Sequence, residues 1–199
     1  MNKLEDFIIS KVRVKLFELF FTQAEEMFYV REITRKAKEE INAVRRELDR
    51  LVGAGLLKSE ERGNRLYYSL NKRYVFYQEL QQMIEKSSGL GKKIRQLRKK
   101  LGTIDFVMFS GKFVRRKPAT QGEVDILIIG DVVLAEVSDL IKEEEKIIGR
   151  EINYAVFPRE EFEFRKQRRD PFIMDVLYGT RIMVVGDEDE FAERKLPMT

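Results

Sequence analysis

The 199-residue sequence contains no cysteine and no histidine. Without cysteine the chain can form no disulfide, no thiolate nucleophile and no Cys-ligated zinc site. Without histidine it lacks the usual general base and the commonest transition-metal ligand. Any catalysis would therefore have to rest on carboxylates, lysines or magnesium held by oxygen ligands. The absence of cysteine also fits a reducing compartment, so we expect a cytoplasmic protein.

Long apolar runs are also missing. No stretch approaches the roughly 18 apolar residues that a membrane-spanning helix needs, and the N-terminal MNKLEDFIIS places acidic residues before a very short apolar run, unlike a signal peptide. The composition, 43% hydrophobic and 36% charged, is that of an ordinary soluble globular protein. We therefore expect no membrane partner.

The net charge of +4 conceals an uneven distribution. Residues 73–118 contain 12 Lys and Arg against 3 Asp and Glu, whereas residues 119–199 contain 11 against 19 and residues 1–72 contain 15 against 12. A basic middle segment indicates a polyanionic partner on one face of the molecule. A lysine-rich helix face exposed to solvent explains the same excess, so both readings stay open.

The first 72 residues show helical periodicity in three segments. Apolar residues recur at three- and four-residue spacings and predict helices over 4–21, 30–37 and 40–52. The triplet 28–30 favours an extended conformation that can pair with a later strand. Alternating segments on either side of Gly63-Asn64 predict a hairpin, with its strands over 56–60 and 65–70.

The helix predicted over 40–52 has an apolar face and a polar face. The polar face carries Asn42, Arg45, Arg46 and Asp49. A helix, a turn, a second helix and a hairpin with a basic tip suit a module that lays one helix in a DNA major groove. In such a module the helix residues that reach base edges or phosphates are Asn42, Arg45 and Arg46. The hairpin residues that contact the backbone or an adjacent minor groove are Arg62, Asn64 and Arg65. The alternative for the two helix arginines is a solvated face.

A family resemblance rests on three short motifs in this segment, YVREITRKA, VRRELDRLVGAGLL and ERGNRLYYSLN. The segment resembles the winged helix-turn-helix transcriptional regulators of the arsenic-repressor type over about the first seventy residues. The resemblance implies that the partner is double-stranded DNA. It also implies a homodimer, because two half-sites require two recognition helices.

Residues 73–101 are predicted to form a helical connector interrupted at Ser87-Ser88-Gly89. The aromatic helix 73–88 is a candidate for part of a dimer interface, and packing on its own domain is the equal alternative. The basic helix 90–101 suits a position along a phosphate backbone, with a solvated face as the default reading.

From residue 102 the periodicity changes to that of a layered α/β domain. The pattern predicts strands over 104–109, 124–129, 152–157 and 182–185. The predicted helices are 132–148, 159–168 and 171–177. On the first of these helices the residues at core spacing are Leu134, Val137, Leu140, Ile141 and Ile147.

A strand, a glycine-containing turn and a second strand with two carboxylates form a chemical constellation in this domain. Glu123 and Asp125 are two residues apart, so strand alternation places them on one face. Two such carboxylates can hold magnesium, while backbone groups of the turn around Gly111 donate to phosphate. Acidic residues that only make the end of a strand soluble are the bland alternative, and a structural ion-pair network with the nearby cations is another.

The words FSGKFVRR and GEVDILIIGD resemble the signature of the minimal nucleotidyltransferases, and the resemblance covers about residues 102–186. It implies a nucleoside triphosphate near Gly111, Lys112 and Arg115, and magnesium on Glu123 and Asp125. The chain departs from the family in three places. Lys112 replaces a serine, Glu123 replaces an aspartate, and the third carboxylate position offers Asn153. Glu151 is an alternative to Asn153 because alternation gives it the same face.

The sequence therefore predicts a two-domain α+β and α/β protein, with a winged helix-turn-helix in 1–72, a connector in 73–101 and a nucleotidyltransferase-like domain in 102–199. The leading hypothesis is a sequence-specific DNA-binding regulator whose second domain is catalytically inactive and serves ligand sensing, oligomerisation or protein contact. One alternative is an active magnesium-dependent nucleotidyltransferase that modifies a protein or small molecule. Another is an antitoxin-type protein that binds a partner protein.

Overall fold

The computed structural model describes residues 8–120 and 122–193 and is a mixed α+β structure with two separate sheets. The chain forms two compact units, Met1–Ser88 and Gly89–Thr199. The boundary between them falls inside the segment 73–101 that we expected as a connector. Among the described helices, none combines the length and apolar character that crossing a lipid bilayer requires.

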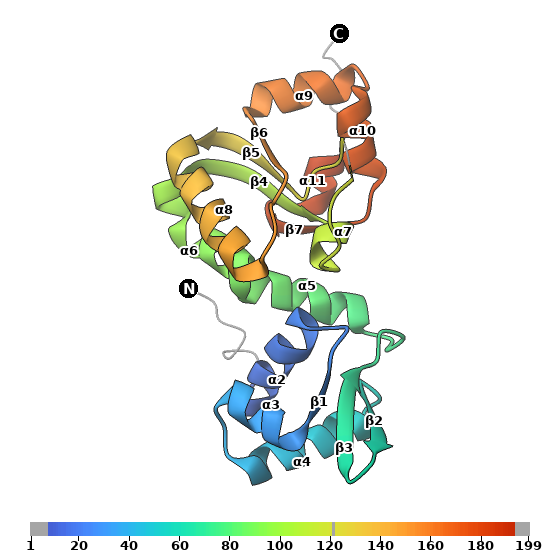
Figure 1. Ribbon diagram of the computed structural model, residues 1–199. Helices are drawn as coiled ribbons and strands as arrows, with labels where there is room; N and C mark the ends of the chain where they lie inside the picture. The colour runs from blue at the N-terminus through green and yellow to red at the C-terminus, as the bar shows by residue number, and fades with distance from the viewer. Residues whose placement is uncertain (1–7, 121, 194–199) are drawn as a thin grey trace. The chain divides into compact units, whose positions relative to one another are not determined.

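The first unit surrounds a three-stranded antiparallel sheet of order β1-β3-β2 (Figure 1). Its elements in chain order are α2 (Lys11–Thr22), β1 (Met27–Tyr29), α3 (Val30–Ala37), α4 (Ile41–Gly53), β2 (Leu57–Arg62), β3 (Arg65–Leu70) and α5 (Tyr77–Ser87). The prediction of a helix over 30–37 and of a short strand that pairs with the hairpin is confirmed.

Local capping decides where these helices begin. The Ser10 hydroxyl accepts a hydrogen bond from the Arg13 backbone N–H at 3.2 Å, so α2 begins at Lys11. A Ser side chain is a favourable cap because it satisfies a donor that has no partner within the helix. The helix predicted from residue 4 is therefore wrong for residues 8–10, and its residues 4–7 lie outside the described residues.

In the core of the first unit, buried side chains of α2, α3 and α4 pack against the sheet. The predicted apolar face of α4 is confirmed by Val44, Leu48 and Leu51, which are buried against Ile33 of α3. Glu47 is also buried on this side of α4, which the apolar pattern did not predict. Arg13 of α2 forms an ion pair with Glu47, and Arg50 lies 3.5 Å from its other oxygen. A buried charge needs such a partner, so this pair fixes α2 against α4.

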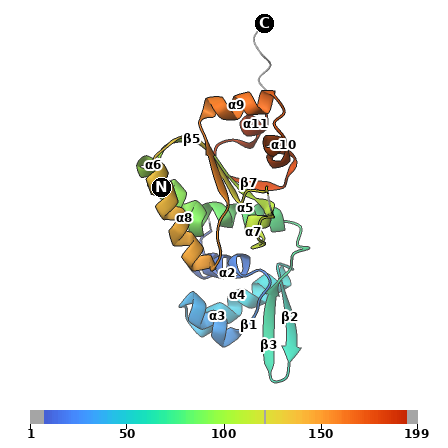
Figure 2. The same cartoon turned by 45° about the horizontal axis from the view of Figure 1, so that its top comes forward.

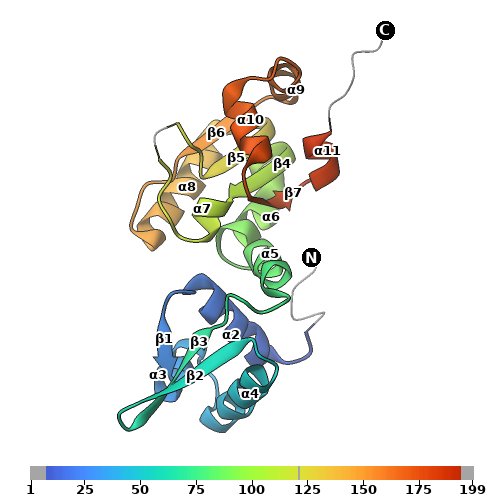
Figure 3. The same cartoon turned by 90° about the vertical axis from the view of Figure 1, so that its right-hand side faces the viewer.

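The hairpin β2–β3 forms as the sequence predicted. Its strands pair from Leu57 opposite Leu70 to Arg62 opposite Arg65, and Gly63 adopts φ +59° in the turn. Glycine has no Cβ and tolerates this left-handed conformation at little cost. Figures 2 and 3 show the hairpin as an arm that projects beyond the helices of its own unit.

The segment before α5 folds as two successive turns rather than as helix. The Tyr74 N–H donates to the Asn71 carbonyl and the Tyr77 N–H donates to the Tyr74 carbonyl, each at 3.0 Å. α5 therefore begins at Tyr77, four residues later than predicted. The turns leave Val75 75% exposed and Phe76 56% exposed.

The second unit contains a four-stranded mixed sheet of order β6-β5-β4-β7, in which only β5 and β6 are parallel. Its elements in chain order are α6 (Gly89–Leu101), β4 (Gly102–Ser110), α7 (Gly111–Val114), β5 (Ile126–Val132), α8 (Leu134–Ile148), β6 (Tyr154–Phe157), α9 (Arg159–Gln167), α10 (Pro171–Tyr178), β7 (Arg181–Val185) and α11 (Glu188–Ala192). The strands and longer helices match the prediction within a few residues, whereas α7 and α11 were not predicted.

Helices cover both faces of this sheet (Figure 1). Val107 and Phe109 of β4 lie in the core shared with α6 and α8. Their neighbours Phe106 and Met108 lie in the second core, which α9, α10 and α11 cover. The alternation of β4 thus supplies both cores. Two predicted core positions of α8 are wrong, because Leu134 and Ile147 are 63% and 68% exposed.

The basic helix α6 packs beside the acidic helix α8. Lys93 lies 3.5 Å from Glu144, and Lys100 lies 2.6 Å from Glu136. Arg98 donates to the Ile104 carbonyl at 2.7 Å. Part of the positive charge that the sequence concentrates in this segment therefore serves packing within the second unit.

Candidate functional sites

The outer face of α4 presents exposed polar side chains. Asn42, Arg45 and Arg46 are exposed, and among residues 8–120 and 122–193 their side chains have neither a hydrogen-bond partner nor an ion pair. The start of this helix is capped by Glu40, whose two carboxylate oxygens accept from the backbone N–H groups of Asn42 and Ala43 at 2.9 Å. These backbone hydrogen bonds lower the pKa of Glu40, so the cap is charged at neutral pH.

A groove of about 530 Å³ lies beside this face, between α4 and the hairpin. It is lined by Tyr29, Val30, Arg31, Arg45, Asp49, Asn64, Arg65, Leu66 and Tyr68. The groove brings together Arg45, Asn64 and Arg65, three of the six residues that the sequence predicted for DNA contact. Arg31, at the start of α3, is a further cation of the groove that the sequence reasoning missed.

The two hairpin arginines have different surroundings. The Arg65 guanidinium lies over the Tyr29 ring, 4.6 Å from its centroid, and Tyr29 meets Tyr67 edge to face at 5.8 Å. This stack ties β3 to β1 and holds Arg65 at the groove. Arg62 instead forms two hydrogen bonds to Glu60, at 2.9 and 3.2 Å. These bonds raise the pKa of Arg62 and lower that of Glu60, so the tip carries a neutralised pair.

In the second unit, the turn predicted around Gly111 is a short helix that packs closely on the loop before β7. The Ser110 hydroxyl accepts from the Phe113 N–H at 3.1 Å, and the Gly111 N–H donates to the Thr180 carbonyl at 2.6 Å. A Cβ atom at position 111 would lie 2.0 Å from Thr180 Oγ1. Only glycine fits here, and these two N–H groups of the turn already have acceptors.

A cleft of about 480 Å³ opens beside α7. Its polar lining includes Ser110, Lys112, Arg115, Glu123, Asp175, Thr180 and Arg181. Its apolar lining includes Met108, Val124, Phe172 and Val176. The cleft thus brings together the three residues predicted for phosphate binding, Gly111, Lys112 and Arg115, with Glu123.

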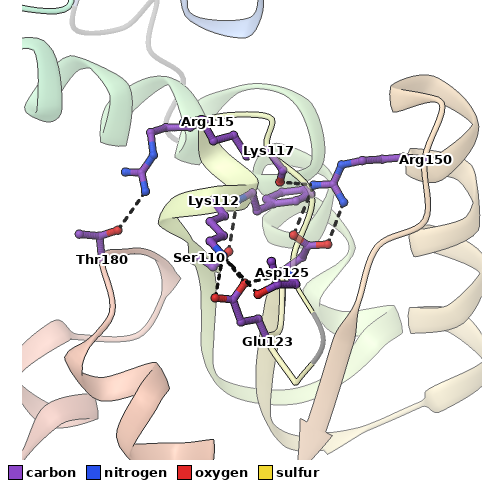
Figure 4. A network of polar contacts seen from close by, with 10 residues as sticks. Ser110, Lys112, Arg115, Lys117, Glu123, Asp125, Arg150 and Thr180 are labelled. Carbon is purple, nitrogen blue, oxygen red and sulfur yellow. Dashed lines mark hydrogen bonds and ion pairs between the residues drawn. The ribbon is translucent and has the colours of Figure 1, made fainter.

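Glu123 is held by the predicted phosphate-binding lysine (Figure 4). Lys112 Nζ lies 2.7 and 2.5 Å from the two Glu123 carboxylate oxygens, and the Thr120 N–H donates to the same carboxylate at 2.8 Å. The hydrogen bond from Lys112 is the main cause that lowers the pKa of Glu123 from 4.5 to about 2. Glu123 is therefore charged at physiological pH and is paired with Lys112.

Asp125 is fully buried and has a different cation partner (Figure 4). Arg150 donates two hydrogen bonds to its carboxylate, from Nη1 to Oδ2 at 2.9 Å and from Nη2 to Oδ1 at 3.3 Å. The Asn153 backbone N–H donates to Oδ2 at 3.1 Å. Arg150 also donates to the carbonyls of Glu151 at 2.8 Å and Lys117 at 3.2 Å. The sequence reasoning missed Arg150, because nothing in the local pattern connects it to a carboxylate 25 residues earlier.

The far wall of the cleft contains two more arginines. Arg115 lies 3.5 Å from the Thr180 hydroxyl, a weak contact. Arg181 donates to the carbonyls of Leu177 and Gly179, at 2.7 and 3.3 Å, and pairs with Glu188. Arg181 therefore serves mainly to shape the turn between α10 and β7.

The positions that the sequence offered for a third carboxylate contribute none to the Asp125 contacts. Asn153 approaches Asp125 through its backbone N–H, and Glu151 approaches Arg150 through its backbone carbonyl. Across the part of the chain that the structure describes, no three carboxylates gather in a way that could hold a metal ion.

Comparison with protein-family models, with curated proteins and with solved structures gave no match for this chain.

Proposed function

We propose that this protein is a sequence-specific transcriptional regulator that binds double-stranded DNA through a winged helix-turn-helix in its first unit. The observation that carries the proposal is the exposed polar face of α4 beside a projecting hairpin; its side chains Asn42, Arg45 and Arg46 have no hydrogen-bond or ion-pair partner among the described residues. Exposed cations that have no partner within the chain are available to phosphates and base edges.

The order of elements supports this function. A helix, a short strand, two helices and a hairpin make α3 and α4 the helix-turn-helix and the hairpin the wing. α4 has 13 residues, which is about 20 Å of helix. An α-helix with its side chains is about 10–12 Å across, so it fits the B-DNA major groove, which is about 12 Å wide. Since one helix reads one half-site, we propose a homodimer on a two-part operator.

Within this interface the residues would have distinct roles. Arg45 and Arg46 project from α4 toward base edges and phosphates, with Asn42 one turn earlier on the helix. Arg65 would contact the backbone or minor groove beside them, because its stack on Tyr29 holds it at the groove. Arg31 adds a phosphate contact from the start of α3.

The experiment removes the two α4 arginines and leaves the fold intact. Arg45→Ala with Arg46→Ala is expected to weaken a mobility shift on the DNA upstream of the protein's own gene at least about 30-fold, since each base-edge arginine contributes about 1–3 kcal/mol. The melting temperature is expected to change little, because both side chains are exposed and unpaired.

The matched control is Lys142→Ala with Lys146→Ala. It removes the same charge from exposed positions of α8 in the second unit. Control affinity should stay within about threefold of the original. Unchanged affinity in the arginine variant would disprove the assignment of α4 as recognition helix.

For the second unit we propose a nucleotidyltransferase-like fold that acts in ligand sensing, oligomerisation or protein contact. An active nucleotidyltransferase is the second candidate, favoured by the cleft that joins Gly111, Lys112 and Arg115. Incubation with labelled nucleoside triphosphates and magnesium distinguishes the two. We expect no transfer to any acceptor. Transfer that disappears in Asp125→Ala would establish the second candidate.

A further inference from the structure

The nucleotidyltransferase resemblance implies magnesium at Glu123 and Asp125, and the residues around these carboxylates do not fit it. We propose that Arg150 is a built-in cation that takes the place of a divalent metal on Asp125. The cleft would therefore hold any ligand through side chains, without a bridging metal. This inference concerns the second unit alone and would survive a failure of the DNA-binding proposal.

The carboxylate oxygens of Asp125 are already bound within the second unit. An ionised carboxylate has about four acceptor positions. Arg150 and the Asn153 N–H take three of them, and the side chain is only 1% exposed. Magnesium requires near-ideal octahedral geometry and usually keeps several of its waters. An enclosed carboxylate with both oxygens already bound cannot offer that geometry.

The other carboxylate, Glu123, is bound by a different cation. Lys112 and the Thr120 N–H bind Glu123 on the side of α7, whereas Arg150 approaches Asp125 from the end of α8 (Figure 4). The two carboxylates are therefore directed to different cations and do not share one. The third family position, Asn153, contributes only its backbone to this group.

The charges of these four side chains also disfavour a metal ion. Each carboxylate is matched by one fixed positive charge, Lys112 or Arg150, so the group as a whole is neutral. A divalent ion would have to displace a guanidinium from a buried, bidentate pair or lie beside two positive charges. Both are unfavourable at Asp125, which is 1% exposed and where few water molecules screen the charges.

Arg150 also has a position that explains why it can replace an ion. It directly follows Gly149, whose φ of +72° ends α8 in a left-handed cap, and its guanidinium bonds the carbonyls of Lys117 and Glu151. A metal ion commonly joins separate segments in this way. The guanidinium here joins Lys117 in the loop before β5, Asp125 directly before that strand, and Glu151 in the segment before β6.

The test measures manganese binding and thermal unfolding of the full chain. Mn²⁺ binding is followed by the loss of the free-ion EPR signal, and unfolding is compared in EDTA and in millimolar Mn²⁺. The proteins are the unchanged chain, Arg150→Ala, Asp125→Asn and the double variant Asp125→Asn/Arg150→Ala. The unchanged chain and Asp125→Asn are expected to bind Mn²⁺ equally weakly, and Mn²⁺ should not raise the melting temperature of the unchanged chain.

Arg150→Ala leaves a buried carboxylate without its cation. In EDTA we expect its melting temperature to fall by about 10 °C. Mn²⁺ should restore part of this loss in Arg150→Ala but none in the double variant, which lacks the carboxylate. In EDTA the double variant should be more stable than Arg150→Ala. An ordinary ion pair predicts the same loss of stability without any manganese rescue, so absence of rescue overturns the proposal.

If Arg150→Ala does not fold, Arg150→Gln replaces it, because glutamine keeps a hydrogen-bond donor for Asp125. The measurement on the unchanged chain decides independently of either variant. Stoichiometric Mn²⁺ binding that Asp125→Asn abolishes would show a working metal site and would overturn the proposal.

Discussion

The outer face of α4 and the carboxylates of the second unit differ in whether their charges already have partners. Arg45 and Arg46 are exposed and, among the described residues, unpaired. Glu123 and Asp125 are each bound by a cation of the same unit. Both groups carry charge in a pattern that suggests function. Only the first has charge available to a molecule outside the chain.

This difference separates two kinds of experimental effect. A side chain that has no partner within the chain can be removed with little loss of stability, and the effect appears in binding. A side chain whose charge is satisfied internally is part of the packing, and its removal leaves a partner without compensation. We therefore expect changes on α4 to affect affinity and changes around α7 and β5 to affect folding.

One added methyl group beside the second-unit cleft is expected to have a large effect on stability. Gly111→Ala would place a Cβ atom 2.0 Å from Thr180 Oγ1, so the turn or β7 must shift. We expect a loss of about 3 kcal/mol in the free energy of unfolding, measured by urea denaturation. The double variant Gly111→Ala/Thr180→Gly should regain part of it, because it removes the clashing side chain.

The control for this change is Gly53→Ala in α4. Apart from its chain neighbours and the nearby backbone of α4, no described atom lies within 4 Å of a Cβ built there, and alanine is the better helix former. A neutral or slightly stabilising effect is expected. If the two substitutions lower the free energy of unfolding equally, the contrast between the packed surroundings of Gly111 and the open surroundings of Gly53 would not hold.

Much of the fold could be predicted because local pattern and tertiary packing agree. α3, α6 and the hairpin around Gly63 follow directly from apolar spacing and turn chemistry. The boundaries that the sequence missed depend on single hydrogen bonds, such as the Ser10 cap and the turns between Asn71 and Tyr77. Periodicity carries no information about such bonds.

The candidate sites were predicted less completely, because their partners come from distant parts of the chain. The carboxylates Glu123 and Asp125 indicate a metal site only while Arg150 is ignored. The pairing of Arg150 with Asp125 crosses 25 residues and appears only after α8 has folded onto the sheet. Glu47 is a similar case, since its burial makes sense only beside Arg13 of α2.

The hairpin β2–β3 offers the same contrast between its two arginines. Arg65 stacks on Tyr29 at the groove, whereas Arg62 is neutralised by Glu60. We expect Arg65→Ala to weaken DNA binding about tenfold and Arg62→Ala only about twofold. Glu60→Gln should strengthen binding about threefold, because it releases Arg62 for phosphate contact. Mobility shifts at fixed salt measure all three, and a larger loss for Arg62 than for Arg65 would reverse the proposed roles.

The smallest effect is expected for the pKa of Glu123. Its titration measures directly how strongly Lys112 stabilises the charged carboxylate. Its pKa is lowered to about 2 chiefly by the hydrogen bond from Lys112. The stabilisation from this pair is thus fully present above pH 4.5 and is lost as the pH falls through about 2.

NMR titration of the Glu123 side-chain carboxyl should show a midpoint near 2, which Lys112→Met should move toward 4.5. A midpoint near 4.5 in the unchanged protein would mean that Lys112 does not hold Glu123 in solution. Lys112 would then be available to an anionic ligand, as Arg45 and Arg46 are on α4.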